Sequence, residues 1–222
     1  MSSTNRGGVR EASDYYVTPA WAITDFLNTF TADAPALIGE DLTGRDLKIF
    51  DPCAGGNPKT DTLPERGMAY QQAIQAWGKW SLYIFDSMDI REDSPADIHA
   101  DYLKEDLSGF HKIVPDIIIT NPPFSLAMPI IEKSLKDVRQ GGVVIMLQRL
   151  NFYGGQKEKR AFFDRVGLPI AAYVHRKRIP FMPPGSINPV SGKPFGQDSI
   201  EYAHFVWQSG IKSEITRHLR VI

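Results

Sequence analysis

The clearest chemical signal in the sequence is the run Asn121, Pro122, Pro123 and Phe124. Two successive prolines restrict the backbone and remove two N–H donors, so the loop is stiff and offers its carbonyl oxygens as acceptors. The Asn121 side chain adds one more acceptor, and Phe124 adds a flat apolar ring that can stack on a heterocycle. Two acceptors facing a ring-bound amino group favour a pyramidal nitrogen and turn its lone pair toward an electrophile. The run therefore predicts a site that activates an aromatic amine without a metal or a strong base.

A second candidate site is the glycine turn that follows the apolar run at 47–50. Asp51 and Pro52 lead into Ala54, Gly55 and Gly56. Glycines allow the backbone to approach a ligand closely, and an acid at the end of a strand can accept hydrogen bonds from a cationic amine. The turn lacks the G-x-G-x-x-G pattern and any Gly-Lys-Ser/Thr, which argues against a dinucleotide or nucleoside triphosphate site. A plain tight turn remains the alternative.

Acidic residues gather after the next apolar run. Residues 86–106 contain eight acidic side chains and two basic ones. A carboxylate at a strand end is suited to bind both hydroxyls of a ribose, and Asp86 and Asp89 compete for that role. Asp101 lies further along and is placed to accept from an adenine amino group. A solvated acidic surface is the alternative for each of these residues.

The elements that must position these residues alternate between strands and helices. Continuous apolar runs at 47–50, 82–85, 116–120, 143–147, 170–175 and 201–207 predict strands, and helical spacing predicts helices near 19–31, 64–77, 126–138 and 156–166. Unbroken apolar strands that alternate with helices are typical of a mostly parallel sheet covered on both faces. The fold class predicted is α/β, doubly wound. Ligands of such sheets bind beyond the carboxyl ends of the strands, where all three candidate loops lie.

Length and composition predict one ordinary globular domain spanning residues 1–222. Hydrophobic residues make up 42% and charged residues 23%, with 25 Lys and Arg against 26 Asp and Glu. No apolar run approaches the 18 or more residues that span a bilayer, and the N-terminus lacks the apolar region of a secretory signal. With a single cysteine, Cys53, the chain forms no internal disulfide, so we expect a reducing, cytoplasmic location. The five histidines show no ligand spacing, and no metal is predicted.

With Asp14, Tyr15, Tyr16, Val17, Thr18 and Pro19 upstream, the glycine turn and the Asn-Pro-Pro-Phe run resemble the DNA methyltransferases that use S-adenosyl-L-methionine and methylate the N6 amine of adenine. The resemblance covers residues 14–152 well, and residues 153–222 only by strand order. It implies a Rossmann-like class I fold with a mostly parallel sheet of seven strands and an antiparallel last strand. It also implies that the cofactor is held by Tyr16, Thr18, Pro19, Asp51, Ala54, Gly55, Gly56, Asp89 and Asp101, and that Asn121, Pro122, Pro123 and Phe124 hold the target amine. The spacing from acid to acid favours Asp89 over Asp86 for the ribose.

The late part of the chain offers residues for the substrate. Residues 157–178 contain seven basic side chains against two acidic ones, and the loop 179–199 is long and rich in proline. A base inside a duplex must be rotated out to reach such a pocket. Candidate contacts are Phe181 and Phe195 on the base, Arg176 and Arg178 on flanking phosphates, and Phe152 as a gate. The alternative is that these aromatic residues belong to the core and the basic residues are solvated.

These expectations combine into one leading hypothesis and three rivals. The leading one is direct transfer of the methyl group of S-adenosyl-L-methionine to a flipped-out adenine of DNA, most simply double-stranded DNA. An Asn-Pro-Pro-aromatic run also serves RNA bases and the side-chain amide of protein glutamine, so those substrates are alternatives. The basic segment 157–178 favours a nucleic acid over a protein. A protein that binds the cofactor without turnover is the third rival.

Overall fold

The structure is a computed structural model that describes residues 17–56, 67–80, 83–107, 114–155, 157–180 and 200–222. Its helices are α1 (Ala20–Ile38), α2 (Ala69–Trp77), α4 (Ala127–Asp137) and α5 (Lys157–Val166), with short 3-10 helices η1 (Phe124–Leu126) and η2 (Leu150–Tyr153). Its strands are β1 (Leu47–Asp51), β2 (Tyr83–Asp89), β3 (Ile98–His99), β4 (Ile117–Thr120), β5 (Val143–Arg149), β6 (Ala171–Val174), β7 (Tyr202–Gln208) and β8 (His218–Val221). The predicted alternation of strands and helices is confirmed.

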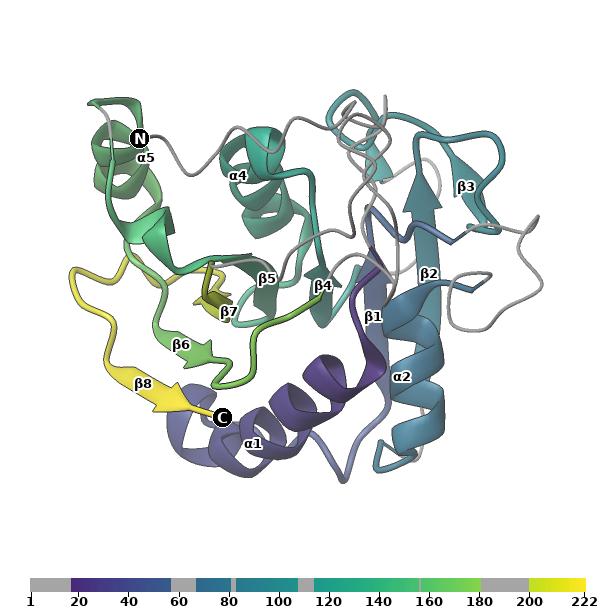
Figure 1. Cartoon of the computed structure of the whole chain (residues 1–222), viewed down its shortest axis with the longest axis horizontal. Coiled ribbons are helices and arrows are strands. Elements are labelled where there is room, and N and C mark those ends of the chain that lie inside the picture. The colour runs from purple at the N-terminus through teal and green to yellow at the C-terminus, as the bar shows by residue number, and fades with distance from the viewer. Residues whose placement is uncertain (1–16, 57–66, 81–82, 108–113, 156, 181–199) are drawn as a thin grey trace, which may run out of the picture.

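All eight strands belong to one sheet with the order β3-β2-β1-β4-β5-β7-β6-β8. Figure 1 shows this row from β3 at the right to β8 at the left. Every neighbouring pair is parallel except those made by β7, which runs antiparallel to both β5 and β6. The chain builds outward from β1 to β2 and β3 in one direction, and from β4 in the other. The strand order therefore reverses between β1 and β4, which is where open α/β sheets bind their ligands.

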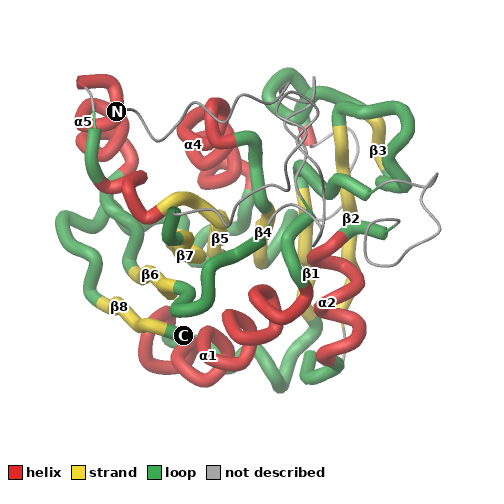
Figure 2. The backbone as a smooth tube through the Cα atoms, viewed as in Figure 1, coloured by secondary structure: helices red, strands yellow, loops and turns green. Residues whose placement is uncertain are grey.

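Two hydrophobic layers cover the two faces of the sheet, as the alternation of side chains along each strand requires. In β4, Ile117 and Ile119 pack in the cluster that contains α1 and α2, whereas Ile118 packs in the cluster that contains α4 and α5. In β5, Ile145 joins the first cluster and Met146 the second. Figure 2 shows α1 and α2 running together along one side of the strands, apart from α4 and α5. The doubly wound class is confirmed.

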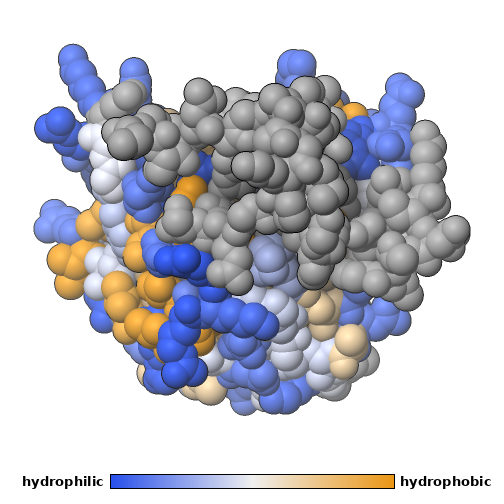
Figure 3. Space-filling view, viewed as in Figure 1, coloured by the Kyte–Doolittle hydropathy of each residue, from blue (hydrophilic) through white to orange (hydrophobic). Residues whose placement is uncertain are grey.

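One detail of the sheet differs from the sequence prediction. The sheet has eight strands instead of seven, because residues 218–221 add β8 beside β6 and parallel to it. The strand predicted as the last, 201–207, is β7, and it is antiparallel as expected. A short strand at a sheet edge needs only one partner, and its alternating pattern is too brief to stand out in the sequence. Leu219 and Val221 of β8 are 60% and 58% exposed, and Figure 3 shows hydrophobic side chains gathered at this side of the molecule.

Helix α1 is also longer than predicted, ending at Ile38 rather than near residue 31. It continues through Pro35 because Leu37 and Ile38 still pack against the core. It ends at Gly39, whose φ of 77° is the left-handed conformation that glycine adopts without strain.

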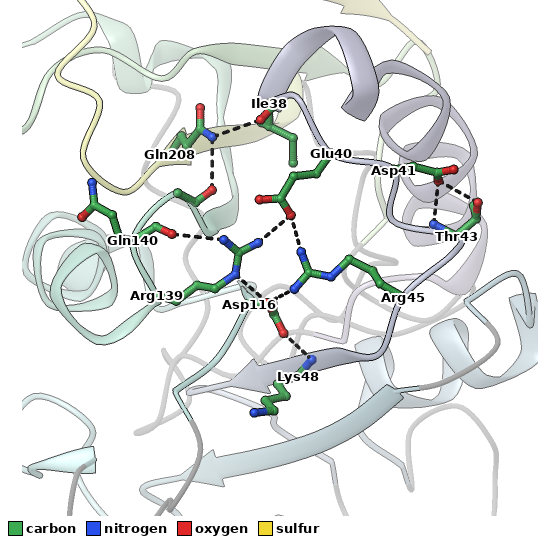
Figure 4. Close-up of polar contacts among 11 residues, drawn as sticks. Ile38, Glu40, Asp41, Thr43, Arg45, Lys48, Asp116, Arg139, Gln140 and Gln208 are labelled. Atoms are coloured by element: carbon green, nitrogen blue, oxygen red, sulfur yellow. Dashed lines mark hydrogen bonds and ion pairs between the residues drawn. The ribbon is translucent and has the colours of Figure 1, made fainter.

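Beyond the amino ends of β1 and β4, a polar network fastens α1 to the sheet (Figure 4). Arg45 and Arg139 each bind both Glu40 and Asp116. The other carboxylate oxygen of Asp116 accepts the backbone N–H of Lys48 at 2.9 Å. Because this network lies at the amino ends of the strands, it holds the scaffold and leaves the carboxyl ends to the candidate site.

Candidate functional site

One cavity lies at the carboxyl ends of β1, β2 and β4, where the strand order reverses. Val17, Ala69, Tyr70 and Leu126 are among its lining residues. Eight of the predicted site residues also line it: Thr18, Ala54, Gly55, Gly56, Asp89, Asp101, Asn121 and Pro123. These residues come from five separate segments of the chain, between Thr18 and Pro123. The fold therefore brings the predicted cofactor loops and the predicted amine-binding loop to one place.

Asp51 ends β1 beneath this cavity and is almost fully buried. Its Oδ1 accepts the backbone N–H of Cys53 at 3.1 Å, while its Oδ2 is buried without a hydrogen-bond partner. The hydroxyl of Thr120, at the end of β4, is also buried and likewise makes no hydrogen bond of good geometry. Loss of solvation, together with the nearby charge of Asp89, raises the pKa of Asp51 from 3.8 to about 7, despite the lowering effect of the Thr120 hydroxyl and the Cys53 N–H. Among the described residues, no cationic side chain pairs with this buried carboxylate.

Asp89 connects β2 to the glycine turn. The strand runs past the predicted end at residue 85 and places Asp89 as its last residue, with 7% of its surface exposed. Its Oδ2 accepts the backbone N–H of Gly55 at 2.8 Å, and its Oδ1 accepts that of Arg91 at 2.9 Å. Asp86 lies earlier in the same strand and is not among the residues that line the cavity. The geometry therefore favours Asp89 over Asp86 as the acid that faces a ligand.

The glycine turn itself depends on backbone conformations that other residues rarely adopt. Gly55 and Gly56 have φ values of 67° and 83°. A Cβ added at Gly56 would lie 2.7 Å from the Cδ of Pro95. Both glycines are therefore required by the turn, which wraps the cavity between β1 and β2.

Asp101 lies two residues after the end of β3 and lines the cavity. In the sheet, β3 and β4 lie on opposite sides of β1, so Asp101 and the amine-binding loop after β4 approach the cavity from different sides. Its Oδ1 accepts the backbone N–H of Leu103 at 3.1 Å, and its Oδ2 pairs with the Lys104 ammonium at 2.8 Å. The hydrogen bond from Lys104 lowers the pKa of Asp101, so the carboxylate is ionised at neutral pH and able to accept from an amino group.

The Asn-Pro-Pro-Phe run follows β4 directly, as predicted. Asn121 and Pro123 line the cavity, and Pro122 is buried. Phe124 opens η1 and lies beside Tyr202, with 5.9 Å between the ring centroids. The guanidinium carbon of Arg149 is 4.8 Å from the Phe124 ring centroid. Asn121 and Pro123 therefore face the cavity, whereas the Phe124 ring is not among the lining residues and lies against the ends of β5 and β7.

A buried polar chain behind the cavity was not foreseen from the sequence. The Tyr70 hydroxyl, in the cavity wall, lies 3.0 Å from Nε2 of His204, and Nδ1 of His204 lies 2.8 Å from Nε2 of His175. Burial lowers the pKa of His175 to about 4 and, together with the neighbouring His175, holds that of His204 well below its usual value, so both rings are neutral. Trp21 covers His175 edge-on at 5.9 Å. The only sequence signal was a histidine inside each of two apolar strand patterns, which specifies no partner.

The remaining predicted residues lie elsewhere. Pro19 caps the start of α1, next to Thr18. Phe152 is a core residue rather than a gate: η2 turns its ring inward, leaving 5% exposed, against Phe162 and Trp207. Arg176 and Arg178 are exposed and line no part of the cavity, and Arg178 lies 3.7 Å from a carboxylate oxygen of Glu201. Tyr16, Phe181 and Phe195 fall outside the described residues.

Two other expectations concern metals and membranes. Within the described ranges, no three His, Cys, Asp or Glu side chains are grouped so as to bind a metal ion. In the same part of the chain, none of the helices combines the length and the hydrophobicity needed to cross a bilayer.

Comparison with known proteins gives matches in structure alone. No protein-family model and no curated protein sequence matches this chain. A candidate class I S-adenosylmethionine-dependent methyltransferase from Listeria monocytogenes superposes with a TM-score of 0.58 at 12% identity, over 93% of this chain and 65% of its own. The methyltransferase subunit of a type I restriction-modification system from Streptococcus thermophilus gives 0.58 at 11% identity, over 90% and 46%. The M protein of the type I restriction enzyme EcoKI gives 0.54 at 10% identity, over 93% and 48%.

These likenesses establish the fold. The chain has the Rossmann-like fold of class I methyltransferases, as its sequence predicted. It spans between 46% and 65% of the length of the three structures named.

Proposed function

We propose that this protein is an S-adenosyl-L-methionine-dependent methyltransferase that acts on the N6 amine of adenine in DNA. The observation that carries the proposal is the meeting of two predicted loops at one cavity: Asn121 and Pro123 share it with Gly55, Asp89 and Asp101. A loop suited to an aromatic amine thus faces loops suited to a nucleoside with a charged tail. The structural likeness to methyltransferase subunits of restriction-modification systems supports the same choice.

The residues of the cavity fit the proposed cofactor. Asp89 holds the ribose: two backbone N–H groups occupy part of its carboxylate, which has about four acceptor positions and so retains capacity for hydroxyls. Asp101 accepts from the adenine amino group. The unpartnered Oδ2 of Asp51 marks a place where a cationic ammonium would relieve an uncompensated buried acceptor. Thr18 and Gly55 complete the wall around the amino acid part.

When bound, S-adenosyl-L-methionine would supply an electrophilic methyl group for N6; its sulfur would leave as a neutral thioether, and the proton lost by N6 would pass to solvent. The protein's contribution is placement and hydrogen bonding. The side-chain oxygen of Asn121 and the backbone carbonyl of Pro122 accept the two amine hydrogens, and the ring of Phe124 stacks on the base. Because the amine becomes more acidic as it is methylated, acceptors that are aimed at its hydrogens bind more strongly as the reaction proceeds.

A direct assay tests this function against its rivals. The 222-residue protein is incubated with tritiated S-adenosyl-L-methionine and unmethylated duplex DNA, RNA or protein, and the labelled product is identified by nucleoside or amino acid analysis. Label in N6-methyladenine of DNA supports the proposal. Label only in RNA or in glutamine transfers the activity to that substrate, and cofactor binding without any labelled product makes the protein a non-catalytic binder.

The role of the amine-binding loop is tested with Asn121→Ala. We expect calorimetry to give nearly unchanged cofactor affinity, while methyl transfer is lost, because the substitution removes the acceptor that the proposed mechanism directs at the target amine. The control is Asn28→Ala, an exposed asparagine on α1 that contacts Trp77 and Lys79, which should transfer methyl groups at the normal rate. Wild-type turnover by Asn121→Ala would remove this residue from the mechanism.

A further inference from the structure

The end of β5 carries an arginine that the proposed mechanism does not use. Arg149 is the last residue of β5, directly opposite Tyr202 of β7. Its guanidinium carbon lies 4.8 Å from the ring centroid of Phe124, in the amine-binding loop. Its Nε is buried and has no hydrogen-bond partner. A buried donor without an acceptor costs about 1–3 kcal/mol, so this position is suited to a ligand that brings an acceptor.

A second cation lies close by. Lys159, in the first turn of α5, directs its ammonium over the ring of Phe152, 5.2 Å from the centroid, and donates to the backbone oxygen of Gly154 at 3.2 Å. Burial lowers the pKa of Lys159, and the positive charge of Arg149 lowers it further. The two side chains therefore repel each other across η2, the short helix that separates them in the chain.

Nothing acidic in the described part of the chain compensates this pair. No described carboxylate forms an ion pair with Arg149 or Lys159. Other basic residues have acidic partners. Arg165, which is in α5 like Lys159, pairs with Glu132 at 3.1 Å, and Arg178 lies 3.7 Å from a carboxylate oxygen of Glu201. An anion at Arg149 and Lys159 would supply the missing acceptor and relieve the repulsion at once.

We propose that Arg149 and Lys159 form a binding site for a backbone phosphate of DNA, next to the nucleotide whose base enters the amine-binding loop. The inference rests on the proposed function and adds to it the residues that select a nucleic acid. A planar guanidinium binds two phosphate oxygens at once, and an ammonium adds a point charge. Contact with the Phe124 ring places this phosphate beside the target base. A protein substrate brings no such fixed charge next to its glutamine.

The test is the salt dependence of DNA binding, which counts the phosphates that a protein neutralises. The dissociation constant for a fluorescent duplex oligonucleotide is measured by anisotropy at several salt concentrations. Each phosphate contact contributes about −0.9 to the slope of log affinity against log salt concentration. We expect Arg149→Gln to bind more weakly at low salt and to reduce the magnitude of this slope by about 0.9. The matched control, Arg165→Gln, removes a neutralised charge from α5 and should keep the wild-type slope.

Cofactor affinity, measured on the same samples, confirms that the variants are folded. If Arg149→Gln is too unstable, Lys159→Gln replaces it, with the same expected direction. A wild-type slope in both variants would overturn the inference, as would failure of the wild-type protein to bind the duplex at low salt. If the slope depends on Arg149 but no methyl group reaches adenine, the phosphate site stands and the proposed activity falls. If adenine is methylated and the slope is unchanged in both variants, the proposed activity stands and the phosphate site falls.

Discussion

Asp51 gives the sharpest quantitative prediction. Its carboxylate is 1% exposed, one of its oxygens has no partner, and its pKa is raised from 3.8 to about 7. Because the pKa of Asp51 is higher in the folded protein than in the unfolded chain, the folded state holds the proton more tightly. This contribution to stability is fully present below about pH 4 and is lost as the pH rises to about 7. The difference of about three pH units corresponds to about 4 kcal/mol, at about 1.4 kcal/mol per unit. In the ligand-free protein at pH 8, Asp51 therefore costs stability.

The substitution Asp51→Asn removes this cost, because the amide is neutral at every pH and its oxygen can still accept the N–H of Cys53. We expect the variant to be more stable than the wild type by up to about 4 kcal/mol at pH 8, with the difference shrinking to near zero at pH 4. Urea unfolding of the ligand-free protein across this range measures it. The control is Asp25→Asn, an exposed carboxylate on α1, which should change stability by less than about 0.5 kcal/mol at either pH.

The same substitution should weaken binding of the cofactor, because the ammonium of the ligand loses its ionised partner. In the wild type, affinity should increase as the pH rises toward 7 and then level off, and in Asp51→Asn this dependence should disappear. An equal or lower stability of Asp51→Asn at pH 8 would refute the claim that the buried carboxylate has no cationic partner in the ligand-free protein.

Three further predictions concern the scaffold and the cavity. Asp116→Ala should lower the free energy of unfolding by about 3 kcal/mol in urea titrations, because it removes one of the two carboxylates that pair with Arg45 and Arg139 and leaves the N–H of Lys48 without its acceptor. Asp89→Asn should weaken cofactor binding by about 10- to 100-fold in calorimetry, the range expected when a charged hydrogen-bond partner is lost; unchanged affinity would assign the ribose to another residue. The buried imidazole of His175 has a pKa of about 4, so it stays neutral in the folded protein, whereas in the unfolded chain it takes up a proton below about pH 6.5. The folded state should therefore lose about 3 kcal/mol of stability between pH 6.5 and 4. His175→Gln should lose correspondingly less over that interval, and an identical acid profile would contradict the neutral, buried state.

Local patterns were sufficient to predict the central architecture and the loops that matter. The apolar runs at 47–50 and 116–120 are unbroken because β1 and β4 are covered on both faces, so their pattern did not depend on distant residues. The glycines and prolines that follow them fix the backbone by their own chemistry. For this reason local sequence was enough to assign the glycine turn and the Asn-Pro-Pro-Phe run to the ends of strands.

Positions that depend on packing were predicted less well. The sequence suggests a gate at Phe152, but the inward orientation of this ring is decided by η2 and by rings from α5 and β7. β2 runs on to Asp89 through pairing with β3, two residues that carry little sequence signal. β8 exists because β6 offers it an edge.

The sequence by itself determined the fold class and the chemistry of each loop, because strand periodicity, glycine and proline act within a few residues. Only the tertiary structure decided which side chains meet: one oxygen of Asp51 buried without a partner, Tyr70 linked to two histidines, and Arg149 placed beside Phe124. Those encounters join segments separated by up to about 130 residues, and contacts of that range arise from the packing of the sheet, which no local pattern records.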